Sequence, residues 1–228
     1  MDFIGKSVAV FGDSIAYGSG NDGFGVAEYL NKDLGLRVFK YAVGGARVGF
    51  CEGKNWLIEQ VTEAIKDGVS PDYVVFDGFT NDCYVNVEIG ATEPDVPLGE
   101  ITVGYEGFDI FKVEKSFTFS RCLEEVVFAF MKYFPKAKLL FFRPHNMGRR
   151  DDFLQRQYGE RALEICKKWG VAAVDLYSES GMNTFIPEHR DLFTNDSYGW
   201  GRGDCTHPNA LGYELKYMPL IEAKLKTL

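Results

Sequence analysis

Short apolar runs alternate with amphipathic segments along most of the chain. Five of these runs predict buried strands, at residues 7–11, 37–41, 73–77, 139–142 and 171–175. Between them, apolar residues recur every three to four positions, which predicts helices at residues 24–34, 55–67, 120–133 and 151–169. We expect Asn55 to cap the second of these helices. A last helix should start at Pro208, because proline suits the first helical turn.

This order of elements predicts an α/β fold with a doubly wound, parallel sheet. The strands are apolar throughout, as in a parallel sheet that is covered by helices on both faces. The 228 residues are expected to form one domain, 1–228. Two connections, about 83–119 and 176–203, are too long for plain turns, so each is either a wall or lid of a site or a surface excursion. Segment 83–119 starts just after Asn81, and we expect it to form part of a pocket wall.

Composition and charge narrow the classes of partner. The chain is 46% hydrophobic and 15% aromatic, which is typical of a globular protein. Its formal net charge is −8 and no block of lysine or arginine stands out, so nucleic acids and anionic membranes are poor partners. No apolar run is long enough to span a bilayer, and the first strand begins almost at once, so we expect a cytoplasmic protein without a signal peptide. The five cysteines are widely spaced without a CxxC pair, which favours free thiols over a zinc site.

Polar residues follow the carboxyl ends of the predicted strands. The first strand runs into Gly12-Asp13-Ser14, an elbow that leads toward a helix. The other ends are followed by Gly44 and Gly45, by Asn81 and Asp82, by Arg143 and His145, and, after a long loop, by Asp204 and His207. The carboxyl ends of parallel strands meet at one edge of the sheet, where ligands bind in such folds. These residues are therefore expected to gather there.

Together these residue types fit nucleophilic catalysis at a carbonyl group. A serine such as Ser14 needs a base to take its proton, and a histidine such as His207 suits that task. Asp204 lies three residues before His207, close enough in the chain to fix its tautomer. The oxyanion formed by attack needs donors, for which we expect the backbone N–H groups of Ser14 and Gly45 and the side chain of Asn81.

The motifs "FGDS", "AVGGA", "GFTND" and "DCTHP" resemble the four blocks of the SGNH, or GDSL, hydrolase family. Their order and spacing match over Gly12–Pro208, nearly the whole chain. The resemblance implies a flavodoxin-like three-layer α/β/α sandwich and a serine esterase or lipase that needs no metal or organic cofactor. It implies small acyl esters as substrates, including acetylated carbohydrates. The elbow differs from the GxSxG type, because Ala16 stands where that motif has its second glycine.

The resemblance also assigns roles to residues. It makes Ser14 the nucleophile, His207 the base and Asp204 its partner. The oxyanion hole is formed by Ser14, Gly45 and Asn81.

Several residues have a second interpretation at this stage. Gly44 is the alternative to Gly45 as the oxyanion donor, whereas Asp13 and Asp82 are interpreted as structural. His145 either lines the pocket with Arg143 or is a surface or capping histidine, and we favour the surface or capping role. His189 is expected to be a solvated loop residue, and Tyr213 is given no catalytic role.

Other functions also remain open. A thioesterase or lysophospholipase would use the same site. A non-catalytic α/β binding module would be expected to break the Ser/Asp/His set, which is intact here. A flavin-binding protein of the flavodoxin type would fit the order of elements but would not explain "DCTHP". The sequence leaves the oligomeric state open.

Overall fold

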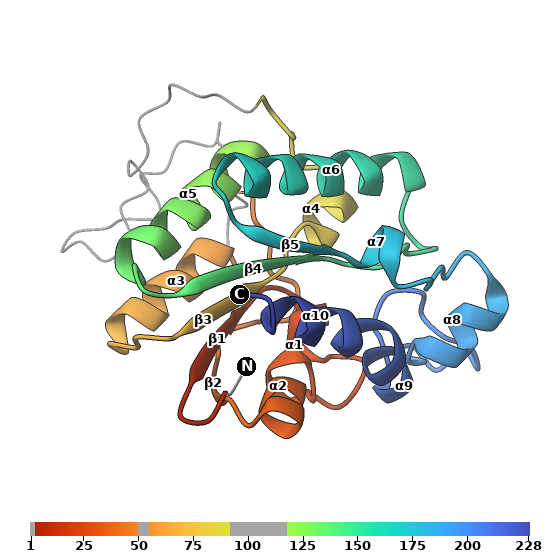
Figure 1. The fold of residues 1–228 in the computed structure, drawn as a ribbon. Coiled ribbons are helices and arrows are strands. Elements are labelled where there is room, and N and C mark those ends of the chain that lie inside the picture. The colour runs from red at the N-terminus through yellow and green to blue at the C-terminus, as the bar shows by residue number, and fades with distance from the viewer. Residues whose placement is uncertain (1–2, 50–54, 92–117) are drawn as a thin grey trace.

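A five-stranded parallel sheet forms the centre of the protein in the computed structural model (Figure 1). The structure describes residues 3–49, 55–91 and 118–228. The strands are β1 (Ser7–Phe11), β2 (Arg37–Lys40), β3 (Tyr73–Phe76), β4 (Lys138–Arg143) and β5 (Ala172–Asp175). Their order in the sheet is β2-β1-β3-β4-β5, and all four neighbouring pairs are parallel. This is the strand order of the flavodoxin-like doubly wound fold, which confirms the predicted fold class.

Helices cover both faces of the sheet (Figure 1). One layer contains α3 (Leu57–Lys66), α5 (Phe119–Tyr133) and α6 (Asp152–Lys168), and the other contains α2 (Val26–Leu34) and α10 (Met218–Leu225). Strands β1 and β3 are buried along their whole length, whereas the edge strand β2 is partly exposed. The apolar runs in the sequence therefore reflect burial of the central strands between two helical layers.

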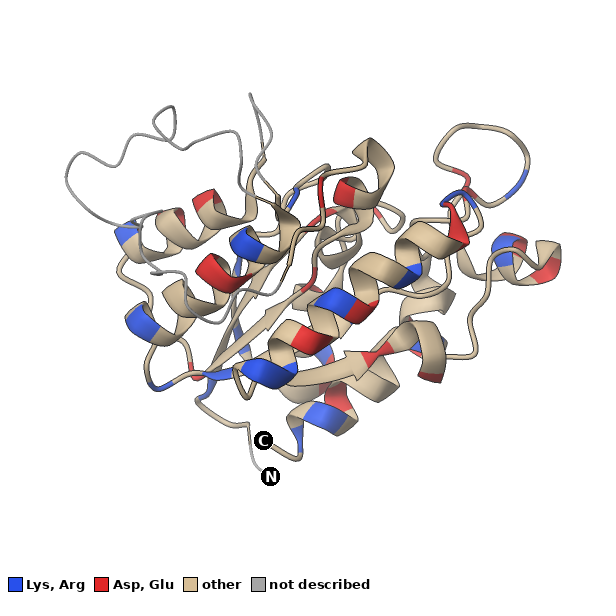
Figure 2. Ribbon diagram, turned by 90° about the horizontal axis from the view of Figure 1, so that it is seen from above, with Lys and Arg blue, Asp and Glu red and all other residues tan. Residues whose placement is uncertain are grey.

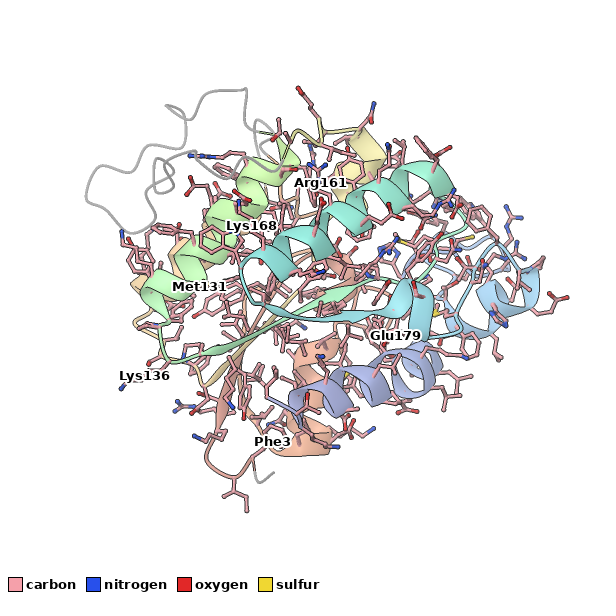
Figure 3. All side chains as sticks on the ribbon, turned by 45° about the horizontal axis from the view of Figure 1, so that its top comes forward. Phe3, Met131, Lys136, Arg161, Lys168 and Glu179 are labelled. Carbon is pink, nitrogen blue, oxygen red and sulfur yellow. The ribbon has the colours of Figure 1, made fainter. Side chains whose placement is uncertain are left out.

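Polar contacts join neighbouring helices within the α3–α5–α6 layer. Arg161 and Lys168 of α6 reach α5, where Arg161 donates to the hydroxyl of Ser120 and Lys168 pairs with Glu124 (Figure 3). Residues of both charge signs alternate along α6 (Figure 2). Within residues 3–49, 55–91 and 118–228, no helix is both long and apolar enough to cross a membrane.

Shorter helices form the carboxyl edge of the sheet. They are α1 (Ser14–Tyr17) after β1, α4 (Thr80–Val85) after β3, α7 (Leu176–Glu179) after β5, α8 (Pro187–Phe193) and α9 (Ala210–Gly212). A π-helical turn, Tyr213–Tyr217, connects α9 to α10. The segment 176–203 is therefore not an irregular loop, because it contains α7 and α8. Of the segment 83–119, residues 92–117 lie outside the described part of the chain, so its expected place in a pocket wall stays a prediction.

Three predicted helix starts are wrong by two residues, and the first is that of α2, which begins at Val26 and not at residue 24. Helix α3 begins at Leu57 after Trp56, because Asn55 has a left-handed φ of 56° and its side-chain Nδ2 donates to the carbonyl of Gly44 instead of capping the helix. The C-terminal helical segment begins at Ala210, because Asn209 caps it by accepting from the backbone N–H of Gly212. Pro208 precedes this cap and forms a bridge with Thr194.

Candidate active site

Ser14 lies on a tight elbow between β1 and α1. Ser14 is 7% exposed and is the first residue of α1. Asp13 caps this helix, since its carboxylate accepts from the backbone N–H of Ile15 at 2.8 Å. Gly12 has a φ of 138°, and a Cβ at this position would lie 1.8 Å from Oδ1 of Asp77. The elbow therefore requires glycine two residues before the serine, and Asp13 has the structural role that the sequence predicts.

Two buried side chains that the sequence analysis missed brace this elbow. Gln60 of α3 binds Gly12 at both backbone groups: Oε1 accepts from the N–H and Nε2 donates to the carbonyl, each at 2.9 Å. Asp77 accepts from the backbone N–H of Asp13 at 2.8 Å. Two features of the sequence could have indicated these roles: Gln60 lies on the buried face of α3, and Asp77 is an acidic residue at the end of an apolar run. Each is weak alone, because the partner lies far away in the sequence.

His207 connects Ser14 to Asp204. Its Nε2 lies 3.0 Å from Oγ of Ser14, and its Nδ1 lies 2.6 Å from Oδ2 of Asp204. The other oxygen of Asp204 accepts from the backbone N–H groups of Thr206 and His207, both at 2.8 Å. The hydroxyl of Ser197 donates to Oδ2. The structure thus brings together the three residues that the sequence predicts as a catalytic set, two of them separated by 193 positions.

The hydrogen bonds of Asp204 determine the tautomer of the histidine. Burial acts to raise the pKa of Asp204, but the hydrogen bond and charge of His207 and the hydroxyl of Ser197 outweigh it and lower the pKa to about 2. Asp204 is therefore ionised at neutral pH and can only accept a hydrogen bond. It follows that Nδ1 of His207 carries a proton, and in the neutral ring Nε2 is free to accept the proton of the Ser14 hydroxyl.

The glycine turn after β2 and the start of α4 lie beside this elbow. The backbone N–H of Val43 donates to the carbonyl of Gly12 at 3.0 Å, which ties the turn to the elbow. Gly45 has a φ of 81°, a left-handed conformation that glycine adopts without strain. Nδ2 of Asn81 donates to the carbonyl of Ala46 at 2.9 Å, so this side chain lies next to Gly45. The predicted oxyanion donors Gly45 and Asn81 therefore come from neighbouring segments, and the amide of Asn81 has a second N–H.

The start of α4, which positions Asn81, is fixed by buried groups. Asp82 is fully buried and accepts from the backbone N–H groups of Val48 and Gly49, at 3.0 and 2.6 Å. Burial raises the pKa of Asp82 to about 7. Phe79, directly before α4, has a φ of 149°, which is strained for a residue with a side chain and is held in place by its burial. Asp82 is thus a structural hydrogen-bond acceptor, as the sequence predicts.

The expectation for His145 is wrong. The residue is fully buried, with Nδ1 2.6 Å from the hydroxyl of Tyr217 and Nε2 3.3 Å from the carbonyl of Cys205. Burial lowers the pKa of His145 to about 4, so the ring is neutral at neutral pH. It is neither a surface or capping histidine nor a pocket residue, because it is fully buried between Tyr217 of the π-helical turn and the backbone of Cys205.

Arg143 and His189 also have structural surroundings. Arg143 is buried, its guanidinium lies 4.1 Å from the ring centre of Tyr177, and it pairs with Asp175 at 3.4 Å. It therefore does not line a pocket with His145. His189 is part of α8 instead of a solvated loop, and its Nδ1 accepts from the backbone N–H of Asn183 at 3.2 Å. In the described segments, no group of three or more His, Cys, Asp or Glu side chains is arranged to hold a metal ion.

Comparison with known proteins identifies a matching family and several structures of similar fold. The model of the GDSL-like Lipase/Acylhydrolase family matches residues 10–215. A member of the lipolytic protein G-D-S-L family from Veillonella parvula has a structure with a TM-score of 0.61 at 16% identity, covering 97% of this chain and 99% of that one. The psychrotrophic esterase EstA from Pseudoalteromonas sp. gives a TM-score of 0.59 at 12% identity, covering 97% of both chains.

A family 3 carbohydrate esterase from Clostridium thermocellum also has a TM-score of 0.59, at 14% identity, covering 97% of this chain and 96% of that one. At these identities the likeness to solved structures shows the fold. The comparison with curated proteins finds no match. The family model covers most of the length of this chain. The chain therefore belongs to the GDSL-like lipase/acylhydrolase family, a family of carboxylic ester hydrolases.

Proposed function

We propose that this protein is a serine ester hydrolase that acts on small acyl esters through an acyl-enzyme intermediate. The observation that carries the proposal is the continuous hydrogen-bonded chain from Ser14 through His207 to Asp204, with distances of 3.0 and 2.6 Å. A serine hydroxyl is a weak nucleophile, and this arrangement supplies both a base and a group that orients the base.

The first half of the reaction acylates the serine. As Oγ of Ser14 attacks the ester carbonyl carbon, Nε2 of His207 takes the hydroxyl proton, and Asp204 stabilises the resulting imidazolium. The negative charge on the former carbonyl oxygen is stabilised by the backbone N–H groups of Ser14 and Gly45 and by the side chain of Asn81. When the tetrahedral intermediate collapses, the bond between carbon and alcohol oxygen breaks, and His207 gives its proton to the leaving alcohol.

The second half regenerates the enzyme. A water molecule attacks the acyl carbon while His207 takes one of its protons, and the same donors stabilise the second oxyanion. The bond between Oγ of Ser14 and the acyl carbon then breaks, the proton returns to Oγ, and the carboxylic acid leaves. Each proton transfer uses the same Nε2 atom, which is why the fixed tautomer of His207 matters.

Hydrolysis of p-nitrophenyl acetate at neutral pH by the wild type and by Ser14→Ala tests the proposal. We expect Ser14→Ala to fold and to lose activity by about 10³-fold or more. The matched control is Ser178→Ala, which removes an exposed serine that donates to Asp175 at 2.7 Å, away from His207. Equal rates for Ser14→Ala and the wild type would refute Ser14 as the nucleophile.

Acetylated carbohydrates are the narrower substrate class that we propose to screen first. Two features support it: the shared fold of the Clostridium thermocellum carbohydrate esterase, and the exposed, stacked rings of Tyr198 and Trp200 in the loop before Asp204, whose centres are 4.5 Å apart. Exposed aromatic faces suit the apolar faces of sugar rings. Release of acetate from acetylated xylose or glucose would support this class. Faster turnover of acyl thioesters or lysophospholipids would favour the alternatives with the same site.

A further inference from the structure

Three arginines and three exposed aromatic side chains gather beside the candidate active site. This arginine–aromatic cluster consists of Tyr84, Arg149, Arg150, Tyr198, Trp200 and Arg202. The guanidinium of Arg149 lies 4.8 Å from the ring centre of Tyr198 and 5.0 Å from that of Trp200. Arg150 lies 4.8 Å from the ring centre of Tyr84, and Arg202 lies 5.6 Å from that of Trp200. Three segments that are distant in sequence thus form one surface.

The same three segments also carry or contact residues of the site. Tyr84 follows Asn81 by one turn on α4. Ser197, next to Tyr198, donates its hydroxyl to Asp204. Burial raises the pKa of Asp13, and the nearby positive charge of Arg150 acts to lower it, so this guanidinium lies within electrostatic reach of the elbow that carries Ser14. The cluster therefore borders the site on the side of Asn81 and Asp204.

The three arginines of the cluster are absent from the ion pairs of the described residues, in which the arginines that take part are Arg121, Arg143, Arg156, Arg161 and Arg190. In the ranges 3–49, 55–91 and 118–228, Arg149, Arg150 and Arg202 form no ion pair with a carboxylate, and the buried Nε of Arg150 has no hydrogen-bond partner. The carboxylate of Asp196, in the same loop, is occupied by the backbone N–H groups of Trp200 and Gly201. The carboxylates of Asp13 and Asp191 lie within electrostatic reach of Arg150 and Arg202, but in the described ranges neither comes within ion-pair distance of these guanidinium groups. In a chain of net charge −8, three neighbouring arginines without an ion pair are a local exception.

Arginines stacked on aromatic rings keep their N–H groups available at the edge of the guanidinium plane. That edge suits a carboxylate, sulfate or phosphate, which it can bind through two hydrogen bonds at once. Tyr84, Tyr198 and Trp200 are 67%, 51% and 49% exposed. Tyr198 and Trp200 stack on each other and a guanidinium lies near each of the three ring centres, so the aromatic surface that remains exposed is what an apolar or ring-shaped part of the same ligand would contact. A substrate with a ring and a negative charge would satisfy both kinds of group.

We propose that the arginine–aromatic cluster selects esters that carry a negatively charged group on a ring, remote from the reacting carbonyl. This inference rests on the proposed ester hydrolase function and adds its substrate class: acyl esters of anionic, ring-containing alcohols, of which an acylated acidic sugar is one kind. In this inference Arg150, whose charge reaches the elbow, contacts the part of the substrate nearer the reacting carbonyl, and Arg149 and Arg202 contact its outer part.

Phenyl acetates that differ only at the para position test this selection. The probes carry a carboxylate, a sulfonate, a neutral carboxamide or a trimethylammonium group, and the measured quantity is kcat/KM divided by the rate constant of uncatalysed hydrolysis. For the wild type we expect this quantity to be about tenfold or more higher for the carboxylate than for the carboxamide, and lowest for trimethylammonium. The carboxylate and sulfonate probes distinguish a planar from a tetrahedral anion site.

Variants assign the preference to the cluster. Arg149→Gln and Arg150→Gln should each reduce the carboxylate-to-carboxamide ratio, and Arg149→Lys should keep part of it, because lysine retains the charge without the planar fork. Arg149 is exposed, so its variants keep the test valid if Arg150→Gln fails to fold. The control is Arg37→Gln, which removes a guanidinium 5.0 Å from the ring centre of Phe39 at the opposite end of the sheet and should leave the ratio unchanged.

Two results would overturn the inference. One is equal treatment of the carboxylate, carboxamide and trimethylammonium esters by the wild type; the other is a carboxylate preference that survives in both glutamine variants. In either case the esters are still hydrolysed, and the proposed function stands. If the wild type hydrolyses no probe faster than Ser14→Ala does, the proposed function fails and this inference fails with it.

Discussion

Replacing Gln60 with leucine tests how the elbow holds Ser14 in place. The side chain of Gln60 is 6% exposed and binds both the N–H and the carbonyl of Gly12, each at 2.9 Å. Leucine has a similar volume but no polar group. Gln60→Leu therefore leaves the buried N–H of Gly12 without a partner two residues before the nucleophile, and the carbonyl of Gly12 keeps only the hydrogen bond from the backbone N–H of Val43.

The expected magnitude follows from the orphaned N–H and the lost bond to the carbonyl. A buried backbone donor without a partner costs about 1–3 kcal/mol and a lost hydrogen bond about 0.5–1.5 kcal/mol, so we expect Gln60→Leu to lower the free energy of unfolding by about 2–4 kcal/mol. For a chain of this size that corresponds to a fall in Tm of about 4–16 °C. Relaxation of Gly12 would also move Ser14 relative to His207, and a displacement of about 1 Å can reduce kcat by about 10²-fold.

Gln155 provides a matched control, because it makes the same pair of bonds elsewhere. Its Oε1 accepts from the backbone N–H of Met147 at 3.0 Å, and its Nε2 donates to the carbonyl of Met147 at 3.1 Å. Urea unfolding and p-nitrophenyl acetate kinetics, measured well below both Tm values, should show similar losses of stability in Gln60→Leu and Gln155→Leu. Only Gln60→Leu should lose most of its kcat.

Two results would refute this reasoning. If Gln60→Leu unfolds at the same urea concentration as the wild type, the two hydrogen bonds do not stabilise the elbow. If both variants lose kcat equally, the loss comes from general destabilisation and not from the position of Ser14.

Three further predictions follow from the site and its buried groups. Asp204→Asn should fold but reduce kcat for p-nitrophenyl acetate by about 10⁴-fold, because asparagine cannot hold the Nδ1–H tautomer of the histidine; a loss below tenfold would contradict this. Burial raises the pKa of Asp82 to about 7, so the contribution of this carboxyl to stability is complete below about pH 4 and is lost as the pH rises to about 7. The free energy of unfolding, measured with urea, should therefore fall less between pH 5 and pH 8 in Asp82→Asn than in the wild type. Gly12→Ala should yield little folded protein, since its Cβ would lie 1.8 Å from Asp77, whereas Gly35→Ala, with a φ of 69° and open space around it, should cost only about 1 kcal/mol; equal Tm values for the two variants would refute the steric argument.

The sequence by itself determined the sheet and the elements that flank it. Strand β1 was predicted at the residues that form it, and Asp151, the expected start of α6, caps that helix by accepting from the backbone N–H of Leu154. These features depend on the spacing of buried apolar residues and on helix capping. Both involve residues that are close together in the chain, so both can be recognised in the sequence. The motifs around Ser14 and His207 could be placed at one edge because parallel strands end there.

Only the tertiary structure decided how the polar residues are used. His145 follows a strand just as a site residue would, yet it is buried against Tyr217, which is 72 positions away. Gln60 braces Gly12 across 48 positions, and nothing in the helical period of α3 indicates that partner. The arginine–aromatic cluster exists because three distant segments meet. The physical reason is that a local pattern records whether a side chain is buried, whereas the partner that satisfies a buried or charged group is supplied by another element of the fold.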